Sequence, residues 1–263
     1  MSVVQNDNIA KFQEGTGTSL LATSDYQSWL LGETRKLLCI GEVGSGKTVL
    51  ASRVTDILLQ EWGHKDNPVL YFFADMRMQQ PQQRTPASIL EDFLKQLIYH
   101  NQHISDQTRK FFERHIQGGN CPTAGGLLAC IKQETIGTPN IFVVIDALDE
   151  LADSCREELL RYLYQLQRKC TMSLMVTSRP NLRTNQLFAE MFPGYRSLEI
   201  RQTQEDLEAY LVGQMHRLPD VVMRDMKLQD YILNEIMSLS HGVYVRDDSQ
   251  RYVNDTLRQV SCC

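Results

Sequence analysis

The chain has 263 residues, of which 42% are hydrophobic and 22% are charged, a composition typical of soluble globular domains. The formal net charge of −5 lacks the basic excess of a nucleic-acid-binding surface, so we expect no nucleic-acid partner. No apolar stretch approaches the roughly 18 residues that a membrane span needs, and the first residues lack the apolar core of a secretion signal. We therefore expect no membrane contact and a cytoplasmic protein, whose seven cysteines, without any CxxC spacing, are reduced and mostly buried.

Apolar runs alternate with amphipathic segments along most of the chain, which is the order typical of a parallel α/β sheet. The continuous apolar run "IFVVI" indicates a central strand that is buried on both faces. In "RTPASILEDFLKQLIYH", Thr85 is placed to cap a helix that has Pro86 at its first position, and "RKFFERH" fits a solvated helix face. Strands are expected at residues 36–40, 68–73, 141–145, 174–177 and 196–200, and helices from residue 47 onward, over 84–100 and over 156–169.

Beyond residue 203 the pattern contains helices only, as in "QEDLEAYLVGQMHRL" and "LQDYILNEIMSLSHG". This change predicts a helical subdomain that follows the sheet. The last residues are polar and carry little apolar periodicity. The predicted organisation is a lead-in over 1–30, an α/β core over 31–203, a helical subdomain over 204–244 and a divergent tail over 245–263.

The segment "KLLCIGEVGSGKT" joins an apolar strand to a helix through a glycine-rich turn that satisfies the pattern GxxxxGK[ST]. Glycines at 41, 44 and 46 let the backbone take positive φ and approach a phosphate closely. Backbone N–H groups and the helix N-terminus attract the anion, the lysine adds charge at the β- and γ-phosphates, and the threonine hydroxyl binds Mg²⁺. The alternative is a flexible turn with a surface lysine. The predicted nucleotide-binding residues are Gly41, Gly44, Ser45, Gly46, Lys47 and Thr48.

An acidic motif follows the strand in "NIFVVIDALDEL". Asp146 stands at the carboxyl end of a buried strand, where an aspartate can hold Mg²⁺ as the second metal-binding residue beside Thr48. Asp149 and Glu150 come three and four residues later, and either carboxylate is a candidate catalytic group that orients and polarises an attacking water. The alternative is that Asp149 and Glu150 cap and charge the next helix.

A third motif, "SLMVTSRP", ends a strand with a hydroxyl and a guanidinium. Ligands of parallel α/β sheets bind outside the carboxyl ends of the strands, so Arg179 is expected beside the phosphate loop as a catalytic residue that contacts the γ-phosphate. A salt bridge to a surface carboxylate is the alternative for Arg179.

The three motifs together are typical of P-loop ATPases that have an extra strand between the P-loop strand and the acidic strand. This class predicts the sheet order 5-1-4-3-2. No [NT]KxD base-recognition motif occurs in the chain, which weakens a Ras-like GTPase interpretation. The expected cofactors are Mg²⁺ with ATP or ADP, and GTP is the alternative nucleotide.

The motifs "IGEVGSGKT", "VVIDALDEL" and "LMVTSRP", together with "YFFAD" and "LEIRQTQEDLEAYLVGQM", resemble the NACHT module of fungal NLR-like proteins, often grouped as nephrocystin-3-like N-terminal domains. The resemblance extends from about Gly15 to Val243 and includes the small residue Ala147 after Asp146.

The resemblance implies a signalling NTPase of the STAND class, a slow switch in an innate-immunity or incompatibility type of pathway. A diphosphate-bound closed form of such proteins opens upon exchange and associates with itself or with other NLR-like chains. By motif, Lys47 and Thr48 serve the phosphates and Mg²⁺, Asp146 serves Mg²⁺, Asp149 or Glu150 positions water, and Arg179 senses the γ-phosphate.

The chain departs from the family pattern near Val245, and we expect the winged helix and repeats of such proteins to be absent. Two interpretations of function follow: a slow Mg²⁺-dependent NTPase, and a binding module in which the nucleotide is a structural plug that is not hydrolysed. A small-molecule kinase is disfavoured because no arginine-rich lid follows a later strand.

Overall fold

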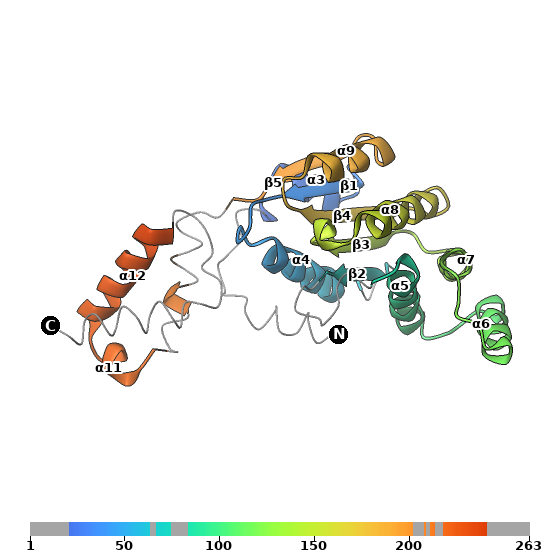
Figure 1. Ribbon diagram of the computed structural model, residues 1–263, viewed down its shortest axis with the longest axis horizontal. Coiled ribbons are helices and arrows are strands. Elements are labelled where there is room, and N and C mark those ends of the chain that lie inside the picture. Colours follow the sequence, from blue (N-terminus) through green and yellow to red (C-terminus); the bar gives the residue numbers. More distant parts are fainter. Residues whose placement is uncertain are drawn as a thin grey trace.

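A computed structural model describes residues 21–63, 67–74, 84–201, 208, 211–213 and 218–240. Its five strands form one parallel sheet in the order β2-β3-β4-β1-β5 (Figure 1). Starting from the β5 edge, this is the predicted order 5-1-4-3-2, so the predicted α/β P-loop NTPase fold class is confirmed. The strands are β1 (Lys36–Ile40), β2 (Val69–Phe73), β3 (Ile141–Asp146), β4 (Met172–Ser178) and β5 (Arg196–Glu199).

Helices connect successive strands and cover both faces of the sheet (Figure 1). Thr85 accepts a hydrogen bond from the backbone of Ser88 and Pro86 opens the helix, so the predicted cap is confirmed. The described helices are α3 (Ser24–Leu30), α4 (Lys47–Glu61), α5 (Pro86–Asn101), α6 (Asp106–Gly118), α7 (Ala124–Glu134), the short 3₁₀ helix η2 (Leu148–Glu150), α8 (Asp153–Gln167), α9 (Leu182–Met191), α11 (Asp220–Met223) and α12 (Met226–Ser240).

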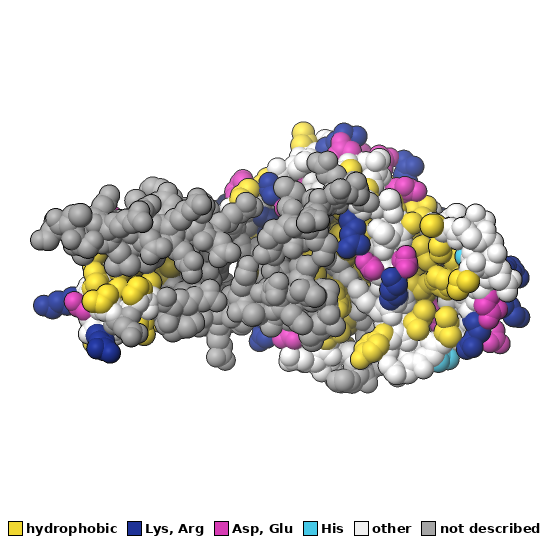
Figure 2. Space-filling model, turned by 60° about the horizontal axis from the view of Figure 1, so that its bottom comes forward, with side chains coloured by type: hydrophobic (Ala, Val, Ile, Leu, Met, Phe, Trp, Pro, Cys, Tyr) yellow, Lys and Arg dark blue, Asp and Glu magenta, His cyan; other side chains and the backbone are white. Residues whose placement is uncertain are grey.

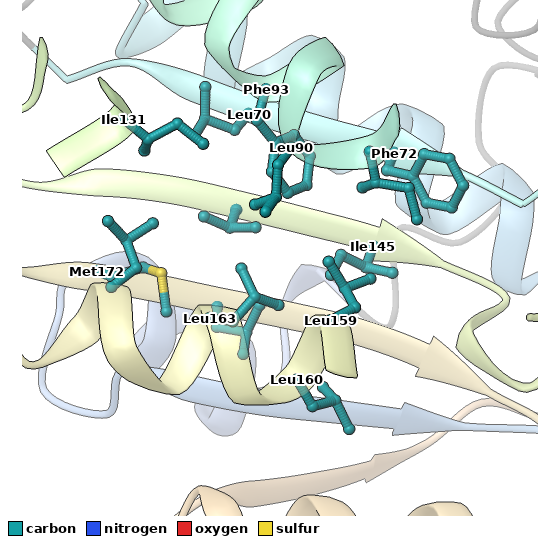
Figure 3. Packing of buried hydrophobic residues seen from close by; sticks show 14 of the residues in the cluster. Leu70, Phe72, Leu90, Phe93, Ile131, Ile145, Leu159, Leu160, Leu163 and Met172 are labelled. Atoms are coloured by element: carbon teal, nitrogen blue, oxygen red, sulfur yellow. The ribbon is translucent and has the colours of Figure 1, made fainter. Parts of the chain in front are cut away.

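The larger hydrophobic cluster lies between the sheet and the layer formed by α5, α7, α8 and α9. Figure 3 shows side chains of α5 and α8 meeting those of β2, β3 and β4. Full burial of each large aliphatic or aromatic side chain stabilises the fold by about 1.5–3 kcal/mol. The residues labelled in this view are Leu70, Phe72, Leu90, Phe93, Ile131, Ile145, Leu159, Leu160, Leu163 and Met172.

The opposite face of the sheet packs against α3 and α4. Trp29 of α3 is fully buried there, and its indole N–H donates to the carbonyl of Leu174 at 3.1 Å. Trp29 therefore anchors α3 to the sheet, because its ring buries a large apolar area and its indole N–H is paired with an acceptor.

The alternation of side chains along β3 and β4 decides which helical layer each strand end meets. Phe142 and Val144 of β3 and Met175 of β4 belong to the cluster with α4. Asp146 and Thr177, each two residues after a member of this cluster, therefore lie on the α4 face. Both face the helix that begins with the glycine-rich turn.

A groove of about 340 Å³ lies between α5 and α6 and is lined by apolar side chains that include Ile98, Phe112 and Ile116. Hydrophobic side chains gather toward the end of the molecule that carries these two helices (Figure 2). Arg109 and Lys110 of α6 are exposed, which agrees with the predicted solvated helix face.

Beyond the sheet, α11 and α12 pack against each other, and residues 208 and 211–213 are helical. Residues 1–20 of the predicted lead-in and the predicted tail over 245–263 lie outside the described residues. Within the part of the chain that the structure describes, no helix combines the length and apolar character needed to cross a membrane.

Candidate functional site

The glycine-rich turn lies between the end of β1 and the start of α4. Gly44 and Gly46 have φ of 80° and 90°, as expected for positions that favour glycine. Gly46 is the N-cap of α4, and no side chain occupies the helix N-terminus. The N–H groups of the first turn of α4 are therefore left available to an anion.

Gly41 differs from the expectation of positive φ, because its φ does not lie in the left-handed region. The requirement at this position is space instead. A Cβ on Gly41 would lie 2.3 Å from the Ser45 hydroxyl and 2.7 Å from the carbonyl oxygen of Ile200. The turn is thus pressed against the chain that follows β5.

Lys47 is only 9% exposed, and its Nζ donates to the carbonyl oxygens of Gly41 and Glu42, at 2.7 Å in each case. Burial lowers the pKa of Lys47, while the negative charges of Asp149 and Asp146 oppose this shift. The alternative of a surface lysine is wrong, because the ammonium group is folded into the turn.

Asp146 is 1% exposed at the end of β3. The Thr177 hydroxyl of β4 donates to Asp146 Oδ1 at 2.6 Å and accepts a hydrogen bond from the backbone N–H of Ala147 at 2.8 Å. Ala147 has a left-handed backbone, with φ 55° and ψ 49°, an uncommon conformation for a residue with a Cβ. Thr177 therefore fixes both the carboxylate and the sharp turn that follows it.

Burial raises the pKa of Asp146, against the opposing effects of hydrogen bonds from Thr177 and Thr48 and the charge of Lys47. The first helical turn of α4 and the end of β3 therefore meet around this carboxylate. Ser45, in the glycine-rich turn before α4, has a buried hydroxyl oxygen without a hydrogen-bond partner among the described residues. Hard oxygen ligands and an unsatisfied hydroxyl are consistent with a site for Mg²⁺ and phosphate.

Arg179 lies directly after β4 and contacts both acids that follow β3. Its backbone N–H donates to Asp149 Oδ1 at 3.0 Å, its Nε lies 3.4 Å from Asp149 Oδ2, and its Nη2 lies 3.0 Å from Glu150 Oε1. Burial raises the pKa of Glu150, while the Arg179 charge lowers it. Arg179 was expected beside the phosphate loop, and its pairing with the acidic motif was not predicted.

Two alternatives from the sequence are resolved by these contacts. Asp149 and Glu150 belong to η2, and α8 begins at Asp153 after an N-cap at Ala152, so neither acid caps that helix. Arg179 does form salt bridges, but with the two candidate catalytic acids and not with a remote surface carboxylate.

Sequence reasoning missed the double role of Thr177 and the contact of Gly41 with Ile200. A hydroxyl side chain inside the wholly buried strand β4 was the available signal for Thr177, because a fully buried hydroxyl needs partners. The described cysteines are free thiols: Cys39, Cys130 and Cys155 are buried, Cys170 is half-buried and Cys121 is exposed.

Solved structures with a similar fold include PCH-2 of C. elegans, with 12% sequence identity and a TM-score of 0.52. This likeness covers 94% of this chain and 64% of that chain. The Aeropyrum pernix ORC1 protein in complex with DNA has 13% identity and a TM-score of 0.50, over 90% of this chain and 60% of that chain. The chain thus spans less than two thirds of either protein's length, and identities this low show the fold alone.

The expectation that this chain has no nucleic-acid partner gains no support from these likenesses, since the ORC1 structure contains DNA. No curated protein sequence matches the chain. The profile of the family described as nephrocystin 3, N-terminal, matches residues 15–179, which is more than half of the chain. The chain therefore belongs to the nephrocystin 3 N-terminal family, with the fold of a P-loop NTPase.

Proposed function

We propose that the chain binds a Mg²⁺–nucleoside triphosphate, with ATP favoured over GTP, and hydrolyses it slowly as a signalling switch. The observation that carries this proposal is the convergence of the turn at 41–48, Asp146 and the Arg179 contacts at the carboxyl edge of one sheet. In this proposal, Gly41, Gly44, Ser45, Gly46, Lys47 and Thr48 form the nucleotide-binding set.

Asp146 and Thr48 are the residues that would hold Mg²⁺. The cation would supply charge that stabilises the phosphate oxygens. A buried carboxylate with a raised pKa supports this assignment, because a divalent cation offsets the cost of burying its negative charge.

Lys47 would exchange its present acceptors for phosphate oxygens. Its Nζ now satisfies two backbone carbonyls of the turn, and that contact keeps the ammonium group beside the proposed phosphate position. Asp149 or Glu150 would orient the attacking water, and Arg179 would contact the γ-phosphate. Since Arg179 is 38% exposed on its side chain, it retains room to move toward a ligand.

The test is a thermal unfolding experiment on the purified chain with Mg-ADP, Mg-ATP and Mg-GTP, each compared with the ligand-free chain. A ligand at about 100 times its dissociation constant raises the free energy of unfolding by about 2.7 kcal/mol. We expect this shift with adenine nucleotides in the wild type and not in Lys47→Ala.

The matched control is Lys169→Ala, which removes an exposed lysine after the C-terminal end of α8, at the opposite edge of the sheet. This variant should respond to nucleotide as the wild type does. A wild-type chain without any nucleotide response, or an equal response in Lys47→Ala, would contradict the proposal.

A second candidate function is a nucleotide-bound interaction module without turnover. The observation that favours it is the pairing of Arg179 with both carboxylates, which leaves neither acid free to act on water. Phosphate release from Mg-ATP distinguishes the two candidates: release that is lost in Glu150→Gln supports the NTPase, and tight binding without release supports the module.

Three finer expectations stay proposals. They are a role in an NLR-like pathway of the NACHT and STAND type, association with itself or with NLR-like chains upon activation, and a cytoplasmic location. The domain division at residues 30, 203 and 244 is likewise proposed. Family membership supports a regulatory module, and the size of the complex formed with Mg-ATP tests self-association.

A further inference from the structure

The guanidinium of Arg179 has two competing uses in the proposed function. It is expected to contact the γ-phosphate, yet in this structure its Nη2 donates to Glu150 Oε1 and its Nε pairs with Asp149 Oδ2. The carboxylates are mostly buried, with side-chain exposures of 9% for Asp149 and 15% for Glu150. A buried acid that loses its cationic partner is left with an uncompensated charge, so the pair resists separation.

We propose that Glu150 limits the preference of the site for triphosphate over diphosphate by competing with the γ-phosphate for Arg179. This inference rests on the proposed function and adds a regulatory step to the same site. A diphosphate leaves the Arg179–Glu150 pair intact. A triphosphate draws Nη2 away from Glu150, and the carboxylate is then free to orient water. The acid that activates water is thus released only when a γ-phosphate is present.

The proximity of Arg179 to the proposed phosphate position supports this competition. Arg179 follows Ser178, whose carbonyl accepts a hydrogen bond from the N–H of Gly41 at 3.2 Å, and Lys47 Nζ donates to the carbonyl of Gly41 at 2.7 Å, so both cations lie beside the turn. In this structure carbonyl oxygens hold Lys47 and carboxylates hold Arg179. A third phosphate between them would satisfy both cations at once.

The two acids differ in what ties them to Arg179, and this difference selects Glu150. Asp149 accepts a hydrogen bond from the backbone N–H of Arg179, a contact that remains when the side chain moves. The Glu150 carboxylate is instead held by the guanidinium, through the hydrogen bond from Nη2. Movement of the arginine side chain therefore frees Glu150 and leaves Asp149 anchored at the end of β4.

The departure of Arg179 also changes the chemistry of Glu150. Burial raises the pKa of this carboxyl, and the nearby guanidinium is the main opposing influence. Without the guanidinium, the carboxylate becomes a stronger base, which suits a group that polarises water. Asp149, anchored in place, adds a further negative charge that acts in the same direction.

The experiment measures dissociation constants of Mg-ADP and of the non-hydrolysable Mg-AMPPNP by calorimetry on the full chain. The variants are Glu150→Gln, Arg179→Gln and the double variant. Glu150→Gln removes the competing charge, so the preference for AMPPNP over ADP should rise about fivefold, the usual scale of a partly exposed ion pair. Arg179→Gln should reduce the preference, and Glu150→Gln should then have no further effect in that background.

Glu157→Gln is the matched control, because it breaks the ion pair with Arg161 on the exposed face of α8 by the same chemical change. The preference should stay at the wild-type value in this variant. An unchanged or lowered preference in Glu150→Gln, or an equal rise in the Arg179→Gln background, overturns the inference while leaving nucleotide binding intact. A wild-type chain that binds neither nucleotide overturns the proposed function and this inference together.

Discussion

The bridging hydroxyl of Thr177 offers a direct test of how the end of β3 is held. Thr177 is fully buried, donates to Asp146 Oδ1 at 2.6 Å and accepts from the backbone N–H of Ala147 at 2.8 Å. Thr177→Val keeps the branched shape and replaces the hydroxyl with a methyl group. Both hydrogen bonds are then lost without a large cavity, so the change isolates the polar contribution.

The expected cost follows from these two contacts. A hydrogen bond to a charged group contributes about 1.5–3 kcal/mol, and a buried donor left unpaired costs about 1–3 kcal/mol. The added methyl group returns about 1 kcal/mol through burial. We therefore expect Thr177→Val to lower the free energy of unfolding by about 3 kcal/mol. The N–H of Ala147 then loses its hydrogen bond to β4, so the left-handed turn at this residue should be the first region to loosen.

Urea unfolding of the ligand-free chain measures this loss, with Thr177→Ser as the control. Serine retains the hydroxyl and removes one methyl group, so its expected cost is about 1 kcal/mol. The reasoning fails if Thr177→Val unfolds within about 0.5 kcal/mol of the wild type, or if the serine variant is destabilised as much as the valine variant. If Asp146 holds Mg²⁺ as proposed, the valine variant should also weaken Mg²⁺-dependent nucleotide binding by about 10- to 100-fold.

Three further predictions concern other parts of the core and site. Gly41→Ala places a Cβ 2.7 Å from the carbonyl oxygen of Ile200, so we expect the free energy of unfolding in urea to fall by about 1–3 kcal/mol. Mg-ADP should not stabilise this variant, and nucleotide binding at wild-type strength would contradict the prediction. Trp29→Phe removes the indole donor to Leu174 and leaves a void, and should lower the free energy of unfolding by about 3 kcal/mol; a change below about 0.5 kcal/mol would contradict the anchoring role. Burial raises the pKa of Asp146 in the folded chain. The contribution of Asp146 to the free energy of unfolding is therefore largest below the usual aspartate pKa, and it is lost as pH rises through the raised pKa of the folded chain. In Mg²⁺-free buffer, the stability of the wild type relative to Asp146→Asn should therefore fall with rising pH; a constant or rising difference would refute the assigned burial effect.

The strands could be predicted because a parallel sheet buries both faces of each strand. The short run at 141–145 is rich in β-branched residues, which favours a buried strand over a buried helix, and the structure extends this strand by one residue to Asp146. The glycine-rich turn was predictable for a different reason, since its chemistry constrains residue types at fixed spacing. The order of the strands followed from the class of motif and is confirmed in the sheet.

Three helices were not predicted, at 24–30, 124–134 and 182–191, and the last two have identifiable reasons. The segment 124–134 begins with "AGG", and glycine disfavours a helix interior by about 1 kcal/mol per residue. This helix forms because Leu127, Leu128 and Ile131 are buried against the core, which no local pattern reveals. The segment 182–191 has a sparse apolar pattern and owes its start to the Asn181 cap.

The hydrogen bonds and ion pairs between the strand ends could not be predicted from local patterns either. Arg179 and Glu150 are 29 residues apart, and Thr177 and Asp146 are 31 apart. Their contacts depend on β4 lying next to β3. The sequence predicted that these two strands are neighbours, but not which of their residues contact each other. Short polar side chains at neighbouring strand ends have several acceptors within reach, and packing selects among them.

Three consecutive residues at the end of β4 connect the three motifs of the site. Thr177 holds the end of β3 through Asp146, the Ser178 carbonyl accepts a hydrogen bond from the N–H of Gly41 at 3.2 Å, and Arg179 holds both later acids. This follows from the sheet order, because β4 lies between β1 and β3 and its end separates the turn from the acidic motif. A shift of β4 along its axis would therefore move the glycine-rich turn, the Asp146 carboxylate and the acid–arginine pair together. Under the proposed function, the β4 end is the element through which a change in the number of phosphates reaches the rest of the sheet.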